Sequence, residues 1–547
     1  MPFSNLSTAR IAARLVAPPL AALTAASLLH GVALAATPPT APKTFDTTYA
    51  APMGATLTVA AGGDLQAALN RAQLGDTIVL DAGASWTGPF KLPNKTGGSG
   101  WIYVVSSQLS NLPPPGTRVS PANAANMPKI LAPNTQSALI TEANSHHFRF
   151  VGIELAPVSG AKQIYQVVAI GNNDASPATL PSHIVFDRCY VHGEPAANDR
   201  RGIEMDGAYI AVVDSYLSDF QEVGTDSQAL AAWSTTGPLK IVDNYLEAAG
   251  ENVIFGGADS RAPSLVPSDI DIENNYFFKP LSLIGTPYNV KNLLEFKAAK
   301  RALVSGNTFQ NNPAKNQTGF ALLITPRNQN GTATWSVTAD IAITGNVLIN
   351  VGSGFNIAGR DSNHPGLLTE RILIRNNVVG VTGLNGADGR AFMFTSGGSD
   401  FTIDHNTIIN TASPPACCSN LAASNPGPPT VNNFVFTNNL STQTKFGFFG
   451  AGVGEGNAAL NTAFSNWTFS KNVIVGAKAS IYPTENYFPA TNAEVQFTDY
   501  SAGSYSLAAA SPYKKAGTDG LDIGATIANS SAVTAATPNA PANVVVK

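Results

Sequence analysis

An acidic residue and two lysines stand close together in the middle of the chain, and an arginine follows farther along. These residues are Glu295, Lys297, Lys300 and Arg327. A lysine can remove the proton beside the carboxylate of an acidic sugar, provided that an arginine neutralises that carboxylate. The same residues could instead form surface ion pairs, such as Glu295 with Lys297, each contributing less than about 1 kcal/mol to stability. The spacing therefore permits either proton abstraction from a uronate or a solvated charged face.

A repeating pattern surrounds these residues and must position them. Each unit has a short β-branched strand, one or two Asn or Asp residues and a second short apolar strand, as in LKIVDNYL from Leu239. The second turn positions are Arg188, Ser215, Asn244, Asn275, Asn307, Asn346, Asn377, Asn406, Asn439 and Asn472. They follow one another at intervals of 27 to 39 residues, and an internal repeat of this length indicates stacked rungs.

The residue types explain how the rungs would stack. Asn tolerates the left-handed backbone region, and its amide can bond to the Asn of the next rung. Alternation along each strand points residues such as Ile372 and Ile374 into a continuous core. We therefore predict an Asn ladder beside an apolar core, with about ten rungs spaced ~4.8 Å apart.

The two ends of the chain differ from the repeat. Arg10 and Arg14 precede an apolar stretch that ends in Ala33-Leu34-Ala35, which predicts a signal peptide at residues 1–35, typical of an exported bacterial protein. The signal is cleaved between Ala35 and Ala36 in this interpretation, and no second apolar run predicts a membrane span. We expect a periplasmic or extracellular protein.

The remaining sequence divides into three parts. We predict a linker at residues 36–55, the repeat fold at 56–525 and a disordered tail or linker at 526–547. A short helix containing Leu65 and Leu69 is expected to cover the edge of the first rung.

Composition restricts the partners. Charged residues make up 12% of the chain and the net charge is -4, so nucleic acid is not attracted globally and an anionic partner needs a local basic patch. Three cysteines, Cys189, Cys417 and Cys418, lack zinc-site spacing with the seven histidines. We predict one loop disulfide or none, and no catalytic cysteine.

Three features together resemble the pectin-lyase-like right-handed parallel β-helix superfamily. They are the Gly-Asp-Leu-Gln-Ala-Ala-Leu segment at 63–69, the Asn repeat and the Asp-Ile-Gly-Ala segment at 522–525. The resemblance implies an all-β, single-stranded right-handed parallel β-helix. Members include polysaccharide lyases, polygalacturonases and non-enzymatic surface proteins, so function must come from the site. The Asn-Thr-Asp, Asp-Asp, Gly-His-Gly and Arg-Ile-Lys motifs of the galacturonan hydrolases do not occur.

A local resemblance concerns the segment NLLEFKAAKR. Glu295 and Lys300, five residues apart, with Arg327 on the next rung, are similar to the chondroitinase B and alginate lyase family. That family's base is a lysine following a calcium-binding Glu, so the resemblance implies Lys300 as base and Ca²⁺ as an open cofactor. Leu293 stands where the family places another acidic ligand, and no Asn ligand can be matched. The metal ligands stay unassigned.

Strand alternation predicts a cleft independently of the family resemblance. Aligning Leu230, Ile254, Leu294, Leu322 and Phe355 as inward residues places Trp233, Asp259, Lys297, Arg327 and Arg360 on one flank, beside Glu295. In this hypothesis Arg327 and Arg360 bind the sugar carboxylate and Lys297 removes the proton. Lys300, expected at a turn, is the substitute base, and Glu295 orients the lysine or binds a cation.

The flank has other interpretations. Arg327 and Arg360 could cap turns or pair with Asp361 and Asp259, while Trp233 forms an aromatic platform for sugar. We expect a monomeric, secreted lyase acting on an acidic polysaccharide that contains uronic acid. A non-catalytic glycan-binding surface or adhesion protein and a glycoside hydrolase are the alternatives.

Overall fold

The computed structural model describes residues 36–171, 175–195, 197–412, 419–423, 430–450 and 452–527, with the backbone alone for 419–423. The chain divides into two units, and every described residue belongs to the second, Leu34–Lys547. The predicted signal peptide, most of the predicted tail, and Cys417 and Cys418 lie outside the described residues. No helix among the described residues is long and apolar enough to cross a membrane.

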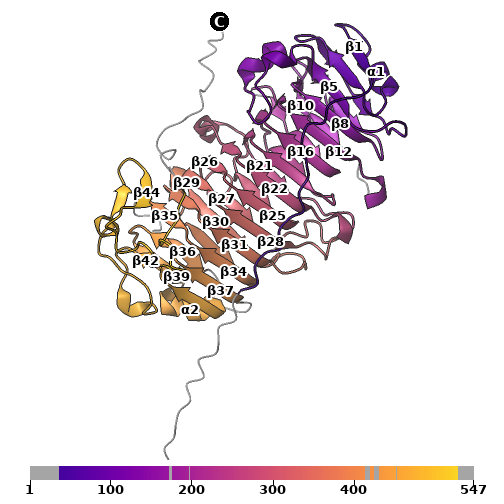
Figure 1. Cartoon of the computed structure of the whole chain (residues 1–547). Helices are drawn as coiled ribbons and strands as arrows, with labels where there is room; N and C mark the ends of the chain where they lie inside the picture. The colour runs from indigo at the N-terminus through magenta and orange to yellow at the C-terminus, as the bar shows by residue number, and fades with distance from the viewer. Residues whose placement is uncertain are drawn as a thin grey trace, which may run out of the picture. The chain divides into compact units, whose positions relative to one another are not determined.

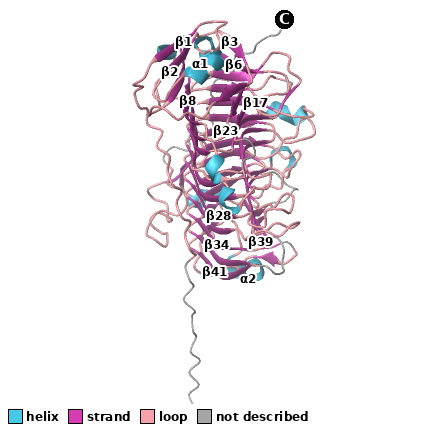
Figure 2. Ribbon diagram, turned by 90° about the vertical axis from the view of Figure 1, so that its right-hand side faces the viewer, coloured by secondary structure: helices cyan, strands magenta, loops and turns pink. Residues whose placement is uncertain are grey.

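Three long sheets run through the second unit, and the chain visits them in the same order in every rung (Figures 1 and 2). The first sheet consists of β1 (Thr56–Val59), β2 (Thr77–Leu80), β5 (Ile102–Ser106), β8 (His146–Val151), β12 (Ser182–Asp187), β16 (Ala208–Val213), β19 (Leu239–Val242), β22 (Ser268–Glu273), β25 (Ala299–Ser305), β28 (Thr338–Thr344), β31 (Glu370–Arg375), β34 (Gly398–Asp404), β37 (Val431–Thr437) and β41 (Phe464–Ser470).

The second and third sheets follow the first around each rung. The second sheet consists of β3 (Ser85–Thr87), β6 (Lys129–Ala132), β9 (Glu154–Pro157), β13 (Tyr190–His192), β17 (Tyr216–Phe220), β20 (Tyr245–Ala248), β23 (Tyr276–Phe278), β26 (Thr308–Asn312), β29 (Val347–Val351), β32 (Val378–Val381), β35 (Thr407–Asn410), β38 (Leu440–Ser441) and β42 (Val473–Ile474). The third sheet consists of β4 (Phe90–Leu92), β7 (Leu139–Thr141), β11 (Val168–Ile170), β15 (Arg201–Met205), β18 (Gln228–Ala232), β21 (Glu251–Phe255), β24 (Leu294–Phe296), β27 (Phe320–Ile324), β30 (Ser353–Ala358), β33 (Phe392–Thr395), β36 (Ser419–Ala423), β39 (Phe446–Gly450) and β40 (Gly454–Glu455).

This arrangement is a right-handed parallel β-helix, as the sequence predicted. Within the three sheets the described strand pairs are parallel, apart from β39 with β40. The sheets hold 14, 13 and 13 strands, more than the about ten rungs predicted, because the earliest rungs lack the Asn signal. Shorter elements outside the three sheets are α1 (Leu65–Arg71), α2 (Asn457–Ala463), and the strand pairs β10 (Gln163–Ile164) with β14 (Asn198–Asp199) and β43 (Phe497–Asp499) with β44 (Ser504–Leu507).

Helix α1 follows from its sequence. The Asp64 side chain accepts a hydrogen bond from the Ala67 N–H at 2.9 Å, which caps the helix. Leu65 and Leu69 are each 1% exposed and belong to the hydrophobic core. The apolar face of the helix therefore packs against the start of the β-helix.

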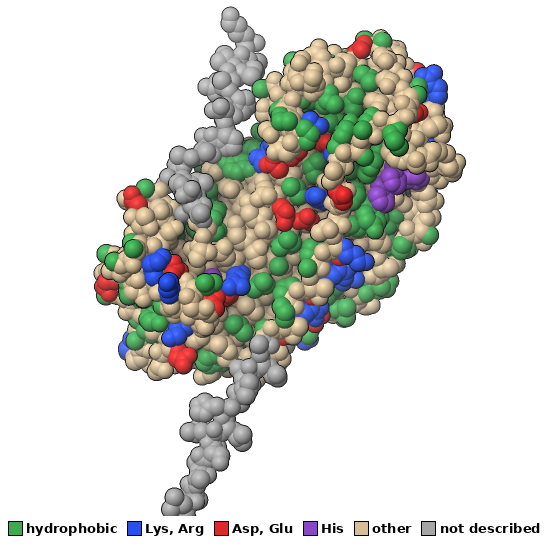
Figure 3. Space-filling view, viewed as in Figure 1, with side chains coloured by type: hydrophobic (Ala, Val, Ile, Leu, Met, Phe, Trp, Pro, Cys, Tyr) green, Lys and Arg blue, Asp and Glu red, His purple; other side chains and the backbone are tan. Residues whose placement is uncertain are grey.

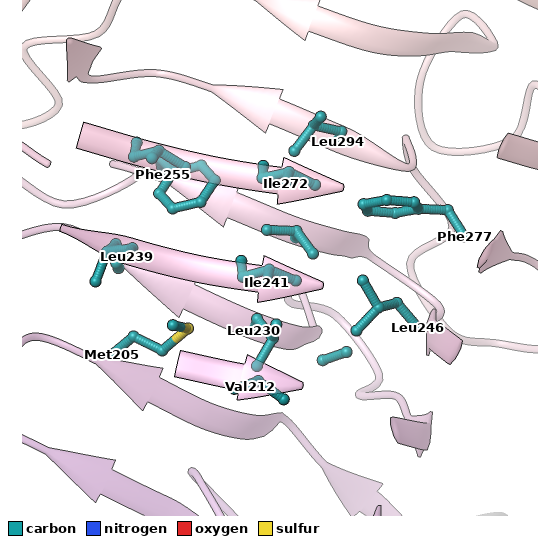
Figure 4. Close-up of a cluster of buried hydrophobic side chains, with 14 of the residues drawn as sticks. Met205, Val212, Leu230, Leu239, Ile241, Leu246, Phe255, Ile272, Phe277 and Leu294 are labelled. Carbon is teal, nitrogen blue, oxygen red and sulfur yellow. The ribbon is translucent and has the colours of Figure 1, made fainter. Parts of the chain in front are cut away.

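The core is filled by inward-facing aliphatic and aromatic side chains of all three sheets (Figure 4). Leu230 of β18 and Leu294 of β24 both lie in it, together with Ile241 and Ile272 of the first sheet. Because each rung buries its apolar face against the next rung, the stack fixes which strand residues must point outward.

The Asn ladder runs along the turn between the first and second sheets. The backbone N–H of Asn346 donates to Asn377 Oδ1 at 2.9 Å, and that of Asn377 donates to Asn406 Oδ1 at 3.0 Å. The predicted inter-rung bonding is confirmed. The left-handed backbone, however, belongs to the preceding residue, for example Asn376 with φ 57°.

One ladder position was wrong by one residue. The backbone N–H of Cys189, not that of Arg188, donates to Ser215 Oγ at 2.9 Å, so Cys189 occupies the ladder. Arg188 is instead the left-handed residue, with φ 50°. The reason is that Asp187 still belongs to β12, so the turn starts one residue later than the Asp suggests. Cys189 is a free, fully buried thiol.

Residues 36–50, the first part of the predicted linker, lie against the first sheet; we call them the strap. Figure 1 shows the strap as the indigo trace that crosses the strands of this sheet. Its start is fixed where the Thr37 N–H donates to Asp400 Oδ1 of β34, and its end where Tyr103 of β5 donates to the Ala50 carbonyl. The strap therefore spans most of the rungs.

Candidate functional site

The register of the third sheet decides which side chains face outward together. Val253, Leu294, Leu322 and Phe355 pair across successive strands. Their side chains are at most 1% exposed and point inward. Since neighbours along a strand face opposite sides, Glu295, Leu323 and Asn356 lie next to one another on the outer face. This outer face carries the residues that the sequence singled out.

The predicted alignment was wrong at β21. Val253, not Ile254, pairs with Leu294, and Ile254 lies on the outer face beside Glu295. The three consecutive apolar residues Val253, Ile254 and Phe255 gave alternation no basis for choosing between the two registers.

A pocket of about 280 Å³ opens on this outer face. Its lining consists of Glu295, Lys297, Gln317, Thr318, Phe320, Leu323, Thr325, Arg327 and Asn356. The pocket brings together Glu295, Lys297 and Arg327, three of the residues selected from the sequence. Figure 3 shows acidic and basic side chains close together on the face of the molecule that Figure 1 presents.

Backbone contacts hold the two cationic residues side by side. The Lys297 N–H donates to the Phe255 carbonyl at 2.7 Å, and the Arg327 N–H donates to the Lys297 carbonyl at 2.8 Å. Arg327 Nη1 donates to Asp361 Oδ1 at 2.9 Å, and the Asp361 side chain is 2% exposed. Lys297 and Arg327 therefore come from adjacent rungs with fixed relative positions.

Asp361 is a buried support for Arg327. Burial raises the pKa of its carboxyl, but backbone hydrogen bonds from Asn363 and Asn328, together with Arg327, outweigh burial and hold the pKa below its ordinary value. The carboxylate thus stays charged and orients the guanidinium.

Glu295 is almost fully enclosed at the edge of the pocket. It is 2% exposed, its Oε2 accepts from Asn292 Nδ2 at 3.1 Å and its Oε1 accepts from Thr325 Oγ1 at 3.2 Å. The Lys297 Nζ lies 3.7 Å from Glu295 Oε1. Glu295 therefore serves as an anchor that holds the lysine amine at the pocket wall.

The calcium implied by the local resemblance does not fit these residues. Leu293, at the position of the second acidic ligand, is fully buried in the core. Glu295 is already hydrogen-bonded to Asn292 and Thr325, and the Lys297 Nζ lies 3.7 Å from its Oε1. Within the described ranges, no cluster of three or more His, Cys, Asp or Glu side chains could hold a metal ion.

A second polar network lies one rung before the pocket. Gln228 Nε2 donates to Glu251 Oε2 at 2.8 Å, and Lys291 Nζ lies 2.5 Å from Asp226 Oδ2 and 3.5 Å from Glu251 Oε1. Burial, and then the nearby Glu295 and Asp226, raise the pKa of Glu251. The network therefore interacts electrostatically with Glu295 and Lys297 of the pocket.

Four predicted site residues do not line the pocket. Trp233 lies on the same face two rungs before Lys297, stacked against Arg201 at 5.2 Å. Asp259 accepts from the N–H groups of Asn330 and Thr332 at 3.1 and 3.0 Å, so it fixes the loop after Arg327.

Arg360 and Lys300 also lie apart from the pocket lining. Arg360 is exposed at the end of its rung. Lys300 is not at a turn but in β25 of the first sheet, where it pairs with Ser268 and Ala339. It lies on a different sheet because the chain turns the corner at residues 297 and 298. Burial, followed by the neighbouring Arg301, lowers the pKa of Lys300.

One polar partner in this site carried no sequence signal. Strand alternation places Thr325 and Asn356 on the outer face, whereas no pattern separates Asn292 from other loop polar residues. Glu204 and Asp206 form a buried pair on β15 and its end, with Asp206 Oδ1 accepting from the Trp233 N–H at 2.8 Å. Burial, and then Asp206, raise the pKa of Glu204. Alternation in the segment from Arg201 to Asp206 could have marked this pair.

Comparison with known proteins finds similar solved structures but no matching family. No protein-family model matches the sequence, and no curated protein matches it. The structure is similar to an alginate lyase from Paenibacillus sp. str. FPU-7, at 15% identity and TM-score 0.37, covering 58% of this chain and 99% of that chain.

Two further similar structures cover more of this chain. The PL6 family alginate lyase AlyGC has 14% identity and TM-score 0.43, covering 87% of this chain and 59% of that chain. The pectate lyase Pel9A has 14% identity and TM-score 0.29, covering 87% and 97%. At these identities and TM-scores the similarity carries no argument about function, which must be argued from the pocket.

Proposed function

We propose that the protein is an exported polysaccharide lyase that cleaves a polymer containing uronic acid by β-elimination. The observation that carries the proposal is the pocket in which Lys297 and Arg327, from adjacent rungs, meet beside the buried Glu295. A groove-like opening on an outer sheet face suits a long polymer, since the chain can pass over the pocket along the stack.

The geometry supports a division of roles. Arg327 binds the sugar carboxylate, which makes the C5 proton more acidic. Lys297 acts as the base that takes that proton, the electron pair forms a double bond between C4 and C5, and the C4–O bond breaks. The leaving oxygen receives a proton from solvent. Glu295 positions the lysine, and Asp361 positions the arginine.

Elimination has a direct assay. The product carries a conjugated unsaturated uronate, so ultraviolet absorbance should rise when the protein is incubated with alginate, polygalacturonate or glycosaminoglycans. Lys297→Ala and Arg327→Ala should each reduce turnover by about 10² to 10⁴-fold, the usual contribution of a positioned base or charge. Lys300→Ala, on the first sheet, is the matched control and should retain turnover. Wild-type turnover in Lys297→Ala, with loss in Lys300→Ala, would move the base to Lys300.

A glycan-binding protein without catalysis is the second candidate. The observation that favours it is that both cations already have carboxylate partners, Lys297 with Glu295 at 3.7 Å and Arg327 with Asp361 at 2.9 Å. In that case the polymer binds, Arg327→Ala weakens binding, and no absorbance appears with any polymer. Reducing ends that appear without absorbance would instead show hydrolysis.

A further inference from the structure

The strap meets the first sheet at a regular interval. The N–H groups of Thr37, Thr40 and Lys43 donate to the Oδ1 atoms of three aspartates at 2.9, 2.8 and 3.0 Å. These acceptors are Asp400, Asp340 and Asp269 of β34, β28 and β22. Every third strap residue therefore contacts every second rung, because β31 and β25 lie between the three acceptor strands.

The acceptors belong to a built ladder of charged residues. Asp269, Asp340 and Asp400 all have left-handed backbone, with φ of 55°, 57° and 60°. The intervening rungs carry Arg301 and Arg371 at the same position. Arg301 Nε donates to Asp269 Oδ1 at 2.7 Å, and Arg371 Nε donates to Asp340 Oδ1 at 2.7 Å. The aspartates are thus held in place by the sheet itself, with oxygen atoms facing the strap.

The electrostatics of the acceptors fit this role. Burial would raise the pKa of Asp340, but hydrogen bonds from Arg371 and from the Thr40 N–H outweigh burial and hold the pKa below its ordinary value. The same direction holds for Asp269, where burial is outweighed by Arg301 and the Lys43 N–H. The carboxylates stay charged, and a charged acceptor strengthens each hydrogen bond.

The sequence of the strap matches the spacing of the ladder. A polyproline II segment repeats every three residues and rises about 9.3 Å in that length, while two rungs of a parallel stack span about 9.6 Å. Prolines stand at 38, 39 and 42, where no N–H is used, and the three donor positions are not proline. An extended, proline-rich segment therefore presents its N–H groups in phase with the aspartates.

The second half of the strap contacts the first sheet through an aromatic ring and a backbone carbonyl. The Phe45 ring meets the edges of the His183 and Tyr209 rings at 5.8 and 5.6 Å. Arg149 Nη1 donates to the Thr47 carbonyl at 2.8 Å. Together these contacts tie the strap to rungs that lie far apart in the sequence.

We infer that the Asp–Arg ladder of the first sheet is a peptide-binding surface for an extended proline-rich segment with an N–H donor at every third residue, and that its occupant is this chain's own N-terminal segment. The surface lies on a different sheet from the Lys297 pocket, so its failure would leave the proposed function untouched. The strap closes only after the rung of Asp400 has formed, since its first anchor joins residues separated by 363 positions.

Two proline variants of the full chain test this inference. Thr40→Pro removes both the N–H and the side-chain hydroxyl that Thr40 offers to Asp340 but keeps a backbone compatible with polyproline II. Ala41→Pro adds the same ring at a position whose N–H makes no contact in the ladder. We expect proteolytic cleavage within the strap to become at least about tenfold faster in Thr40→Pro, from the loss of a hydrogen bond to a charged group. Ala41→Pro should stay at the wild-type rate. Equal rates in the two variants would overturn the inference.

A binding experiment tests the partner. A synthetic peptide of residues 36–50 should bind to a variant that lacks these residues, and a peptide with Pro at positions 37, 40 and 43 should not bind. Binding of both peptides alike, or of neither to the folded variant, would contradict the inference. If the shortened variant does not fold, the two proline variants of the full chain decide the question.

Discussion

Replacement of one buried ladder residue, Asn377→Ala, should destabilise the fold strongly. Asn377 Oδ1 accepts from the Asn346 N–H at 2.9 Å, and Asn377 Nδ2 donates to the Ile343 carbonyl at 2.9 Å. In the alanine variant the Asn346 N–H and the Ile343 carbonyl stay buried and lose these hydrogen bonds. Each costs about 1–3 kcal/mol, so we expect the free energy of unfolding to fall by about 2–6 kcal/mol.

The chain itself supplies the control. At the equivalent position of an earlier rung, Ser215 Oγ accepts from the Cys189 N–H at 2.9 Å. Asn377→Ser therefore keeps an acceptor for the Asn346 N–H and should lose only about half as much stability as the alanine variant.

Urea denaturation followed by circular dichroism measures both variants, and the midpoint and slope should be compared because a stacked repeat can lose cooperativity. Equal destabilisation by Ala and Ser, or a loss below about 1 kcal/mol in the alanine variant, would refute the argument from unpaired groups.

Two further predictions concern the outer face of the third sheet. Asp361→Asn should reduce kcat/KM on the uronate polymer by about tenfold, since the charge that orients Arg327 is lost, while Asp361→Glu restores part of it and the melting temperature of both stays near wild type. Glu204→Gln should gain stability relative to wild type as pH rises from about 5 to the folded-state pKa of about 8, as melting temperatures at several pH values would show. The sign follows because the raised pKa keeps Glu204 protonated in the folded state, whereas the unfolded chain releases that proton above its ordinary value of 4.5. A constant difference across this range would contradict the burial argument.

The local sequence pattern of each rung was enough to predict the repeating parts of the fold. The Asn ladder and the apolar core follow from residue types whose role is the same in every rung, so Asn346 and Asn377 could be matched without a structure. The strap could not be predicted in this way. Its donors are ordinary backbone N–H groups, and their partners lie up to 363 residues away in the sequence.

The pocket was predictable in part for the same physical reason. Lys297 and Arg327 were brought together because the predicted pairing of Leu294 with Leu322 is correct. The apolar runs at 293–294 and 320–324 left the choice of inward residue as open there as at Val253 and Ile254. Asn292 was missed as a partner of Glu295, and Thr325 was placed on the outer face but not recognised as a second partner, since a polar residue near a strand end has many possible partners and only the folded register selects one. Lys300 was placed at a turn because the corner between the third and first sheets is only two residues long.

Register error explains where the predicted flank and the observed pocket differ. A slip of one residue moves a side chain to the opposite face of its sheet, and the slip at Val253 and Ile254 put Asp259 in place of Ala258 in the predicted row. The error does not spread to Lys297 and Arg327, because the pairing of Leu294 with Leu322 is set by these two rungs alone. A functional site in a stacked fold is thus best predicted over two adjacent rungs, where a single correct pairing is enough to bring its residues together. The pocket obeys this limit, since it is built on β24, β27 and β30 and on residues just before or after β24 and β27.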